Sequence, residues 1–305
     1  EANVAVSLAN YGLDAVFVTK LPEHEIGQAA VNSLRRYGVD TGFIARGGSR
    51  LGIYYLEKGA SQRPSKVIYD RAGSSIATAA REDFNWNAIL EGASWFHFTG
   101  ITPALGDTLA DICEEACATA KQKGVTVSCD LNYRKKLWSR EKAGQVMSRL
   151  CKYVDVCIAN EEDAKDVFGI EAEDSDITGG RLNFDGYKDV AKKLSDRFGF
   201  DKVAITLRTS ISASENNWMG LLYDGGSFYL SKEYNMKIVD RVGGGDSFGA
   251  GLIYGLLSGK SPQEALEFAV AASCLKHSIE GDFNHVSVDE VENLARGDAS
   301  GRVQR

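Results

Sequence analysis

Apolar residues recur along this chain with two different periods, and segments of the two kinds alternate. Between residues 105 and 120 apolar side chains return every three or four positions, the spacing of one helix face, and Gly124 ends the pattern. Residues 125–130 follow as a short apolar run that indicates a buried strand. Residues 154–159 and 202–207 repeat the strand pattern. This alternation predicts βα units, a largely parallel sheet and therefore an α/β protein.

Helix starts can be placed at two points. The spacings Ser261 to Glu264 and Ser287 to Glu290 are those of capping boxes, so two helices are predicted to begin there. Residues 1–9 already follow a helical pattern, and no predicted strand precedes them. We therefore expect that some natural N-terminal sequence, including a strand, is missing from this chain.

Residues 42–71 break the alternation. Leu51–Glu57 and Lys66–Asp70 are two predicted strands joined by a polar turn, with no helix between them. They predict a hairpin that projects from the main sheet. Its aromatic side chains could cover a substrate or contact a second subunit, or the hairpin could be an ordinary sheet edge. Tyr69 and Arg71 lie where it rejoins the main domain, a place where ligands often bind.

Composition and charge narrow the class of protein. The chain has 305 residues, 44% of them hydrophobic, enough for one large α/β domain with a small appendage. Its 35 basic and 42 acidic residues give a net charge of −7, which argues against a general nucleic-acid or anionic-membrane surface. The sequence contains no run of 18 apolar residues and no basic leader, so we expect a soluble, cytoplasmic protein.

Cysteine and histidine add little chemistry to this picture. The six cysteines form no CxxC pair and mostly lie in apolar patterns, which predicts buried thiols in a reducing compartment. The four histidines have no zinc-binding spacing. His97, within Trp95–Phe98, is interpreted as a core residue. Histidine therefore implies no metal site.

The strongest chemical signal is a glycine-rich loop, residues 243–245, followed by Asp246 at the start of an apparent helix. Backbone N–H groups of such a loop can converge on an anion, and the helix start reinforces them. Asp246 would repel a phosphate, a cost easier to understand if the carboxylate is a base that deprotonates an attacking hydroxyl. The loop thus indicates phosphoryl transfer, although such a helix start could also serve close packing alone.

Two other phosphate-binding motifs do not match the sequence. The nearest approach to a Walker A loop, residues 255–261, has three residues between its glycines where the motif needs four. A dinucleotide-binding fingerprint would require a glycine at the position of Phe248. Both interpretations are excluded.

Four segments occur in the order and at the spacing of ribokinase/PfkB-type sugar kinases, namely residues 3–12, 130–134, 160–163 and 243–246. The chain resembles this family over nearly its whole length. Within the family it is most similar to the kinases of 2-keto-3-deoxygluconate, because of residues 67–74, 132–138, 206–212 and 276–284. The resemblance implies one domain over residues 1–305, a ribokinase-like, Rossmann-type α/β sandwich with a mostly parallel central sheet and a small β-sheet lid within about residues 42–71.

The resemblance also implies roles for individual residues. Asp246 would be the general base, and the amides of Gly243, Gly244 and Gly245 would form the anion hole. The expected substrate contacts are Asn3, Tyr54, Tyr69, Arg71, Arg134 and Asp282. The expected nucleotide contacts are Asn132, Asn160, Thr206, Leu207, Arg208, Ser210, Gly243, Gly245, Ala272 and His277. Glu162 and Asp163 would organise Mg²⁺ through water.

The activity implied is ATP-dependent phosphorylation of 2-keto-3-deoxygluconate to 2-keto-3-deoxy-6-phosphogluconate, with Mg²⁺, by a homodimer paired through the lid. Arg71 and Arg134 favour an acid sugar, because a guanidinium beside a neutral sugar would be desolvated without a countercharge. A kinase of neutral sugars, of the fructokinase or ribokinase type, is the alternative. A non-catalytic sugar-sensing protein of the same fold is a third hypothesis.

Some of these assignments have simpler alternatives. Either arginine could be an ion-paired surface group, the two tyrosines could simply pack the hairpin, and Asp282 could cap a turn. The chain also departs from the family pattern in two places. Asp163 stands where the family has glutamate, so Glu162 could replace it near the metal. The usual threonines before the glycine loop are Arg241 and Val242, which leaves the need for a monovalent cation open.

Overall fold

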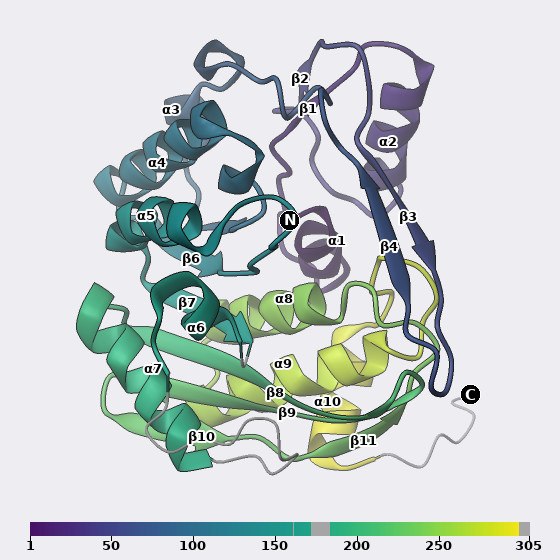
Figure 1. Cartoon of the computed structure of the whole chain (residues 1–305), viewed down its shortest axis with the longest axis vertical. Coiled ribbons are helices and arrows are strands. Elements are labelled where there is room, and N and C mark those ends of the chain that lie inside the picture. Colours follow the sequence, from purple (N-terminus) through teal and green to yellow (C-terminus); the bar gives the residue numbers. More distant parts are fainter. Residues whose placement is uncertain (161, 172–183, 299–305) are drawn as a thin grey trace.

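The computed structural model describes residues 1–160, 162–171 and 184–298. A seven-stranded sheet forms its centre (Figure 1). The parallel strands are, in spatial order, β5 (Trp95–Thr99), β6 (Thr126–Asp130), β7 (Val156–Asn160) and β8 (Lys202–Ser212). Antiparallel strands complete the sheet: β9 (Glu215–Asp224) beside β8, then β10 (Ser227–Leu230) and β11 (Tyr234–Lys237), which both pair with β9. The expected α/β sandwich is confirmed.

Helices cover both faces of this sheet (Figure 1). On one face lie α4 (Asp107–Gln122), α5 (Arg140–Leu150), α6 (Asp163–Phe168) and α7 (Phe184–Phe198). On the other lie α8 (Gly244–Leu257) and α9 (Pro262–Lys276), against which α1 (Ala2–Asn10) and α10 (Val288–Arg296) pack. None of the helices in the described ranges has the length and hydrophobicity of a membrane crossing.

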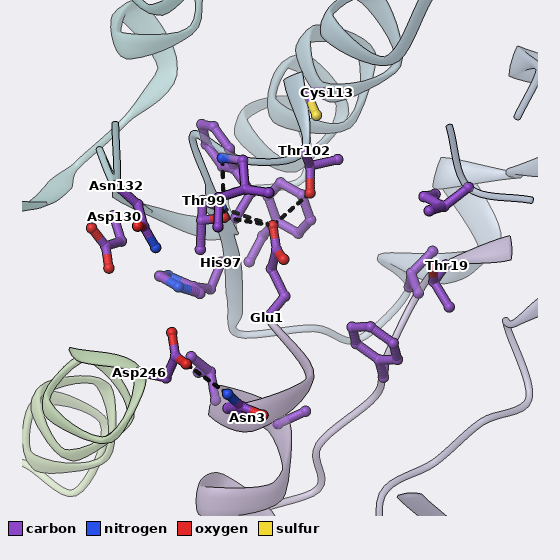
Figure 2. A pocket seen from close by; sticks show the side chains of 18 of the residues that line it. Glu1, Asn3, Thr19, His97, Thr99, Thr102, Cys113, Asp130, Asn132 and Asp246 are labelled. Atoms are coloured by element: carbon purple, nitrogen blue, oxygen red, sulfur yellow. Dashed lines mark hydrogen bonds between the residues drawn. The ribbon is translucent and has the colours of Figure 1, made fainter. Parts of the chain in front are cut away.

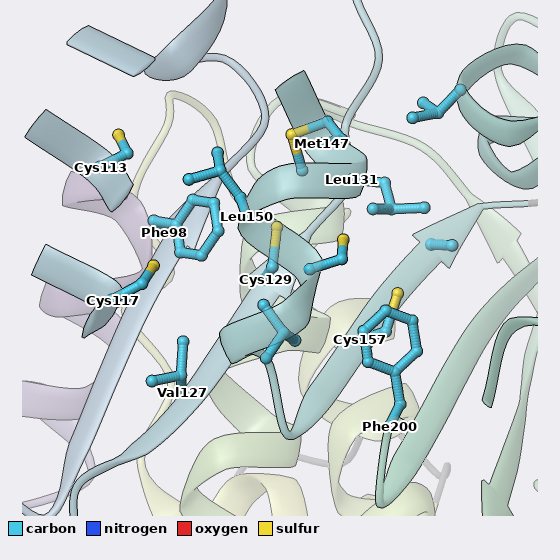
Figure 3. Close-up of a cluster of buried hydrophobic side chains, with 14 of the residues drawn as sticks. Phe98, Cys113, Cys117, Val127, Cys129, Leu131, Met147, Leu150, Cys157 and Phe200 are labelled. Atoms are coloured by element: carbon cyan, nitrogen blue, oxygen red, sulfur yellow. The ribbon is translucent and has the colours of Figure 1, made fainter. Parts of the chain in front are cut away.

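Because side chains alternate along each strand, the sheet contributes to a hydrophobic core on each of its two faces. In β7, Cys157 and Ala159 join the core under α4, α5 and α7, while Val156 and Ile158 join the core under α8 and α9. The first of these cores holds most of the cysteines, as Figure 3 shows for four of them. All six cysteines are free, and only Cys274 is partly exposed. The prediction of buried thiols is therefore confirmed for five of them.

The predicted hairpin is present and forms a separate two-stranded lid. Strand β3 (Ile53–Glu57) pairs antiparallel with β4 (Lys66–Asp70), and Tyr54 faces Tyr69 across the pair. Alternation turns these tyrosines inward, while Ile53, Tyr55 and Ile68 remain exposed. A further pair of short parallel strands, β1 (Lys20–Leu21) and β2 (Ala45–Arg46), lies beside α2 (Glu25–Arg35).

Local sequence signals set several helix ends. Ser261 and Ser287 each accept a hydrogen bond from the backbone of the glutamate three residues on, Glu264 and Glu290, whose side chains bond back to the serines. Both predicted capping boxes are confirmed. One strand differs from the prediction, because β8 continues to Ser212 instead of ending at residue 207. Its second half is polar and is held in the sheet by antiparallel pairing with β9.

The short helix α3 (Trp86–Ile89) and the 3₁₀ turns Arg81–Asp83, Pro103–Leu105 and Cys151–Tyr153 link the larger elements. Asn85 caps α3 by accepting a hydrogen bond from the Ala88 amide. Helix α8 begins within the glycine loop, at Gly244, and glycines farther along it bring it into backbone contact with α9. A Cβ atom built on Gly251 would lie 2.8 Å from Cα of Ala269. The helix that follows the glycine loop is thus packed too closely on α9 to shift alone.

Candidate active site

A cavity of about 1530 Å³ lies beyond the carboxyl ends of the parallel strands, between the main sheet and the lid. This is where open α/β sheets bind ligands. It also continues along the edge of β5 toward α4. The cavity brings together sixteen of the residues predicted for the site: Asn3, Tyr54, Tyr69, Arg71, Asn132, Arg134, Asn160, Glu162, Asp163, Thr206, Arg208, Gly243, Gly244, Gly245, Asp246 and Asp282.

The glycine loop has a conformation that only glycine adopts without strain. Gly243 has φ of 77° and caps α8, and a Cβ atom built on it would lie 2.2 Å from the Asp282 carbonyl oxygen. A Cβ atom on Gly244 would lie 2.5 Å from the His277 ring, whereas one on Gly245 would meet open space. Two of the glycines are thus required by close contacts within the protein. The third leaves room for a ligand at the N-terminus of α8.

Asp246 lies in the first turn of α8 and faces the cavity (Figure 2). Asn3, from α1, donates a hydrogen bond of 2.7 Å from Nδ2 to Oδ2 of Asp246. This bond fixes the direction of the carboxylate and engages one oxygen as an acceptor. The other oxygen remains able to accept a proton from a bound hydroxyl. Asn3, predicted as a sugar contact, therefore also orients the expected base.

The lid is joined to the main domain through Tyr54 and Asp282. The Tyr54 hydroxyl donates to the Asp282 carboxylate, with both oxygens at 2.6 Å. Burial and this hydrogen bond raise the pKa of Tyr54, so the phenol stays protonated at neutral pH. Asp282 therefore does more than cap a turn, and Tyr54 does more than pack the hairpin. The contact closes one side of the cavity.

Two arginines project into this part of the cavity. The Arg71 guanidinium lies over the Tyr69 ring, 4.5 Å from its centre. Arg134 follows β6 and donates to the Tyr133 carbonyl. Both side chains are half-buried, and neither forms an ion pair within the described ranges. They are therefore not ordinary ion-paired surface groups, and their charge is available to an anion.

The loop after β6 adds a carboxylate to the site. Burial, together with the carboxylates of Asp163 and Asp246, raises the pKa of Asp130 well above its usual range, and Arg134 opposes the shift. Two residues later Asn132 has φ of 41°, an uncommon backbone conformation that asparagine tolerates. Such conformations cluster where function fixes the backbone.

Asp163 holds the ends of two strands together. One of its oxygens accepts the Tyr133 amide at 3.0 Å and the other accepts the Asn160 amide at 3.0 Å. Asn160 in turn accepts the amides of Glu162 and Asp163 through its Oδ1. Glu162 is exposed, lines the cavity and forms no side-chain hydrogen bond or ion pair to the residues that the structure describes. Of the two acids predicted near a metal, Glu162 is therefore the more available.

A second pair of arginines lines the cavity near the glycine loop. Arg241 is half-buried and donates from Nη2 to the Ala213 carbonyl at 3.0 Å. Burial lowers the pKa of Arg241, and the nearby charge of Arg208 lowers it further. Two cations held close together in a cavity favour a polyanionic ligand, which relieves their repulsion. Arg208 was predicted as a nucleotide contact, whereas Arg241 was noted only as a departure from the family pattern.

Four predicted nucleotide contacts do not line the cavity. Leu207 and Ala272 are fully buried in two different cores, and Ser210 is exposed outside the cavity. His277 is also buried, with its Nδ1 bonded to the Ser273 carbonyl and its ring against Gly244. Nucleotide contacts from these four residues therefore stay a prediction that the cavity lining does not support. His277 acts on the site only by supporting the loop.

The site also contains residues that were not predicted. His97 lines the cavity and faces the same space as Asp130 and Asp246 (Figure 2), so it borders the site as well as being partly buried. Its position after Trp95 and before Thr99 places it on the strand face opposite Phe96 and Phe98, a signal that the sequence did contain. Glu1 was missed as well. Its carboxylate lies at the cavity wall and accepts hydrogen bonds from Thr99 and Thr102.

Hydrogen bonding fixes the protonation of His97. Trp95 donates from Nε1 to Oγ of Ser128 at 2.7 Å, and that hydroxyl lies 2.8 Å from Nδ1 of His97. Because Ser128 is fully buried and already accepts from Trp95, its own proton is best satisfied by Nδ1. Burial lowers the pKa of His97 to about 4, which keeps the ring neutral. The remaining proton is then on Nε2, which can donate a hydrogen bond.

Comparison with known proteins gives a consistent picture. The sequence pattern of the pfkB family of carbohydrate kinases matches residues 1–284. The 2-dehydro-3-deoxygluconokinase of Thermotoga maritima is similar in structure, with a TM-score of 0.93 and 55% identity over 97% of this chain and 88% of that one. The 2-dehydro-3-deoxygalactonokinase of Haloferax volcanii is 33% identical over 99% of this chain and 88% of its own length. The chain belongs to the pfkB family of carbohydrate kinases.

Proposed function

We propose that this chain transfers the γ-phosphoryl group of ATP to the 6-hydroxyl of 2-keto-3-deoxygluconate, giving 2-keto-3-deoxy-6-phosphogluconate. The observation that carries the proposal is the presence of Arg71 and Arg134, without ion pairs to described residues, in the cavity that also holds Asp246. The name of the 55% identical relative supports the same acceptor. The acid in the name of the Haloferax volcanii relative is an epimer of this acceptor, with the opposite configuration at one carbon.

Asp246 is assigned as the general base. In the proposed step its free oxygen accepts the proton of the 6-hydroxyl while Asn3 holds the other oxygen. The amides of residues 243–245 stabilise the negative charge that spreads over the transferring phosphoryl group. The lid, held by the bond between Tyr54 and Asp282, keeps water away from the site. Positioning of the two reactants supplies most of the acceleration.

The nucleotide is assigned to the part of the cavity near α8. Arg208 and Arg241 offer charge to its phosphates, and Thr206 of β8 pairs with Asn160 at the end of β7. An Escherichia coli protein of the same fold, assigned as a ribokinase II, is known in complex with ATP and Mg²⁺ at a TM-score of 0.80 and 16% identity over 97% of this chain and 87% of that one. ADP release above the sugar-free rate with 2-keto-3-deoxygluconate tests the function. No release would contradict it.

The residues present fit a magnesium ion that arrives with the nucleotide. No three His, Cys, Asp or Glu side chains in the described part of the chain converge on a metal position. Mg²⁺ is commonly held by phosphates and water with one or two carboxylates, and Glu162 is the available carboxylate. When bound, the ion would neutralise phosphate charge. Glu162 and Asn160 would hold it through water.

Glu162→Gln is expected to raise the Mg²⁺ concentration for half-maximal turnover by about 10-fold, in the range found for groups that hold a metal indirectly. The amide keeps the shape of the side chain and loses its charge. Turnover is measured against Mg²⁺ at fixed ATP. Glu25→Gln, an exposed position on α2, is the control and should leave the titration unchanged. An unchanged titration in Glu162→Gln would remove this residue from the metal site.

We infer that two copies of the chain pair through their lids. The outer face of the hairpin carries Ile68, Tyr55 and Ile53, which are 67%, 58% and 40% exposed. A contiguous apolar face of this kind is typical of an interface. Light scattering is expected to give a dimer for the unmodified chain and a monomer for Ile68→Lys, while Ile26→Lys on α2 stays dimeric. A monomeric unmodified protein would contradict the inference.

A further inference from the structure

One lysine is buried behind the glycine loop and has no role in the proposed chemistry. Lys276 ends α9, and it is the only lysine or arginine among the described residues that is buried. Its Nζ donates to the Ile279 carbonyl at 2.9 Å. Burying an ammonium group is unfavourable unless nearby oxygens compensate it. Because burial of the Lys276 ammonium group is unfavourable, we expect a function that explains it.

Lys276 lies between the glycine loop and the turn at Ile279 that follows α9. A Cβ atom on Gly243 would be 3.4 Å from its Cε, so the lysine stem packs against the loop backbone. On the other side, its head binds the turn at Ile279. Burial lowers the pKa of Lys276, while the carboxylates of Asp240 and Asp282 oppose that shift and favour the charged form. The lysine thus presents its charge where the loop and the turn meet.

Asp240 joins the same two segments from the other side. It is 5% exposed and accepts the amides of Val242 at 3.2 Å and Gly281 at 3.1 Å. The Lys58 ammonium lies 3.2 Å from its second oxygen. Acid and base together therefore fasten the residues before the glycine loop to the turn that follows α9.

Donor groups of the protein already engage the oxygens here that could bind a monovalent metal ion, whose need the family resemblance left open. Such an ion requires several oxygen ligands with free lone pairs directed at it. The Ile279 carbonyl already accepts from Lys276, and both Asp240 oxygens accept backbone amides. The hydroxyl groups that the family usually offers before the loop are replaced by Arg241 and Val242. N–H donors of the protein occupy this region instead.

We propose that the Lys276 ammonium is a built-in cation that holds the Ile279 turn against the glycine loop, so that the enzyme needs no added monovalent cation. Lys276 is a positioning residue in this proposal, since it acts through the loop amides. Its fixed charge adds to the positive potential at the start of α8, where the phosphates are assigned. The inference rests on the proposed function for the identity of the bound anion.

The unmodified protein gives the first test. Turnover and the affinity for ATP with Mg²⁺, measured by calorimetry, are compared in K⁺, Na⁺ and choline chloride at one ionic strength. We expect values that agree within about twofold, because a fixed charge does not exchange with the solvent. Activity that disappears in choline and returns with K⁺ would overturn the proposal.

Lys276→Met gives the second test. In choline, the dissociation constant for ATP is expected to rise by about 10-fold or more, the size found when groups that orient a charged ligand indirectly are removed. NH₄⁺ or K⁺ should restore part of the loss. Lys276→Arg should bind ATP better than Lys276→Met, and Lys202→Met, which removes a lysine paired with Asp224, should match the unmodified protein. Unchanged ATP affinity in Lys276→Met would overturn the proposal.

The two proposals fail in distinguishable ways. If none of the sugars were phosphorylated, the proposed function would be wrong, while the ATP-binding measurements would still decide the role of Lys276. If Lys276→Met did not fold, the cation dependence of the unmodified protein and the Lys276→Arg variant would decide it. Cation-dependent ATP binding in both of these proteins would contradict a built-in cation.

Discussion

Replacing Asp246 with asparagine is expected to lower turnover by about 10²–10⁴, the usual contribution of a positioned general base. The amide has nearly the same shape but cannot accept the proton of the attacking hydroxyl. The affinity of the Asp246→Asn variant for ATP should stay the same or increase, because the substitution removes a negative charge from the first turn of α8. Turnover and ATP binding are measured separately, and we expect them to change independently.

Asp107→Asn is the matched control for this experiment. Asp107 also lies in the first turn of a helix, α4, but its side chain is 83% exposed and pairs with Lys142. Its substitution should leave turnover unchanged. Near-normal turnover in Asp246→Asn would reject Asp246 as the base. A loss of ATP binding equal to the loss of turnover would instead indicate a damaged loop.

The acceptor preference has the second largest expected effect. A carboxylate acceptor offsets the desolvation of Arg71 and Arg134 through charge-assisted bonds, and a neutral sugar cannot. We therefore expect kcat/KM for 2-keto-3-deoxygluconate to exceed that for fructose or ribose by at least about 10³. The 4-epimeric acid should be intermediate, since it keeps the carboxylate and changes one hydroxyl. ADP release in the same assay gives all four values.

Variants of the two arginines locate the cause of this preference. Arg134→Lys should lower kcat/KM for the acid although it keeps the charge, because an ammonium lacks the planar fork that binds both carboxylate oxygens. The Arg71→Ala/Arg134→Ala pair should lose most of the preference for the acid over fructose. Arg36→Ala, an exposed position outside the cavity, is the control. An intact affinity for the acid in the double variant would favour the neutral-sugar alternative.

The features predicted well were those encoded by neighbouring residues. The glycine loop, the capping boxes at Ser261 and Ser287 and the lid hairpin each depend on a few positions close together in sequence. The site was predicted as far as a family motif covers it, and the cavity indeed brings those motifs together. How the motifs contact one another, as in the bond between Asn3 and Asp246, could not be predicted from spacing.

The predicted contacts that do not line the cavity have a simple physical cause. A resemblance places a residue on an element but does not say which way its side chain points. On β8, Thr206 faces the cavity and its neighbour Leu207 faces the core, as the period of a strand requires. Ala272 is on the face of α9 that packs against Gly251 of α8. His97 was missed for the converse reason, because its apolar neighbours on β5 concealed the polar face of the strand.

The glycine contacts between α8 and α9 have a mechanical consequence. Where Gly251 and Gly255 bring the backbones together, a Cβ atom would approach Ala269 and Ala265 to 2.8 Å, so neither helix can slide or rotate without a steric clash. The part of the site next to α8, where the phosphates are proposed to bind, is therefore expected to be rigid. By contrast, the hairpin is attached to the opposite wall through contacts that include the bond from Tyr54 to Asp282, so we expect any opening that admits a substrate to involve the hairpin.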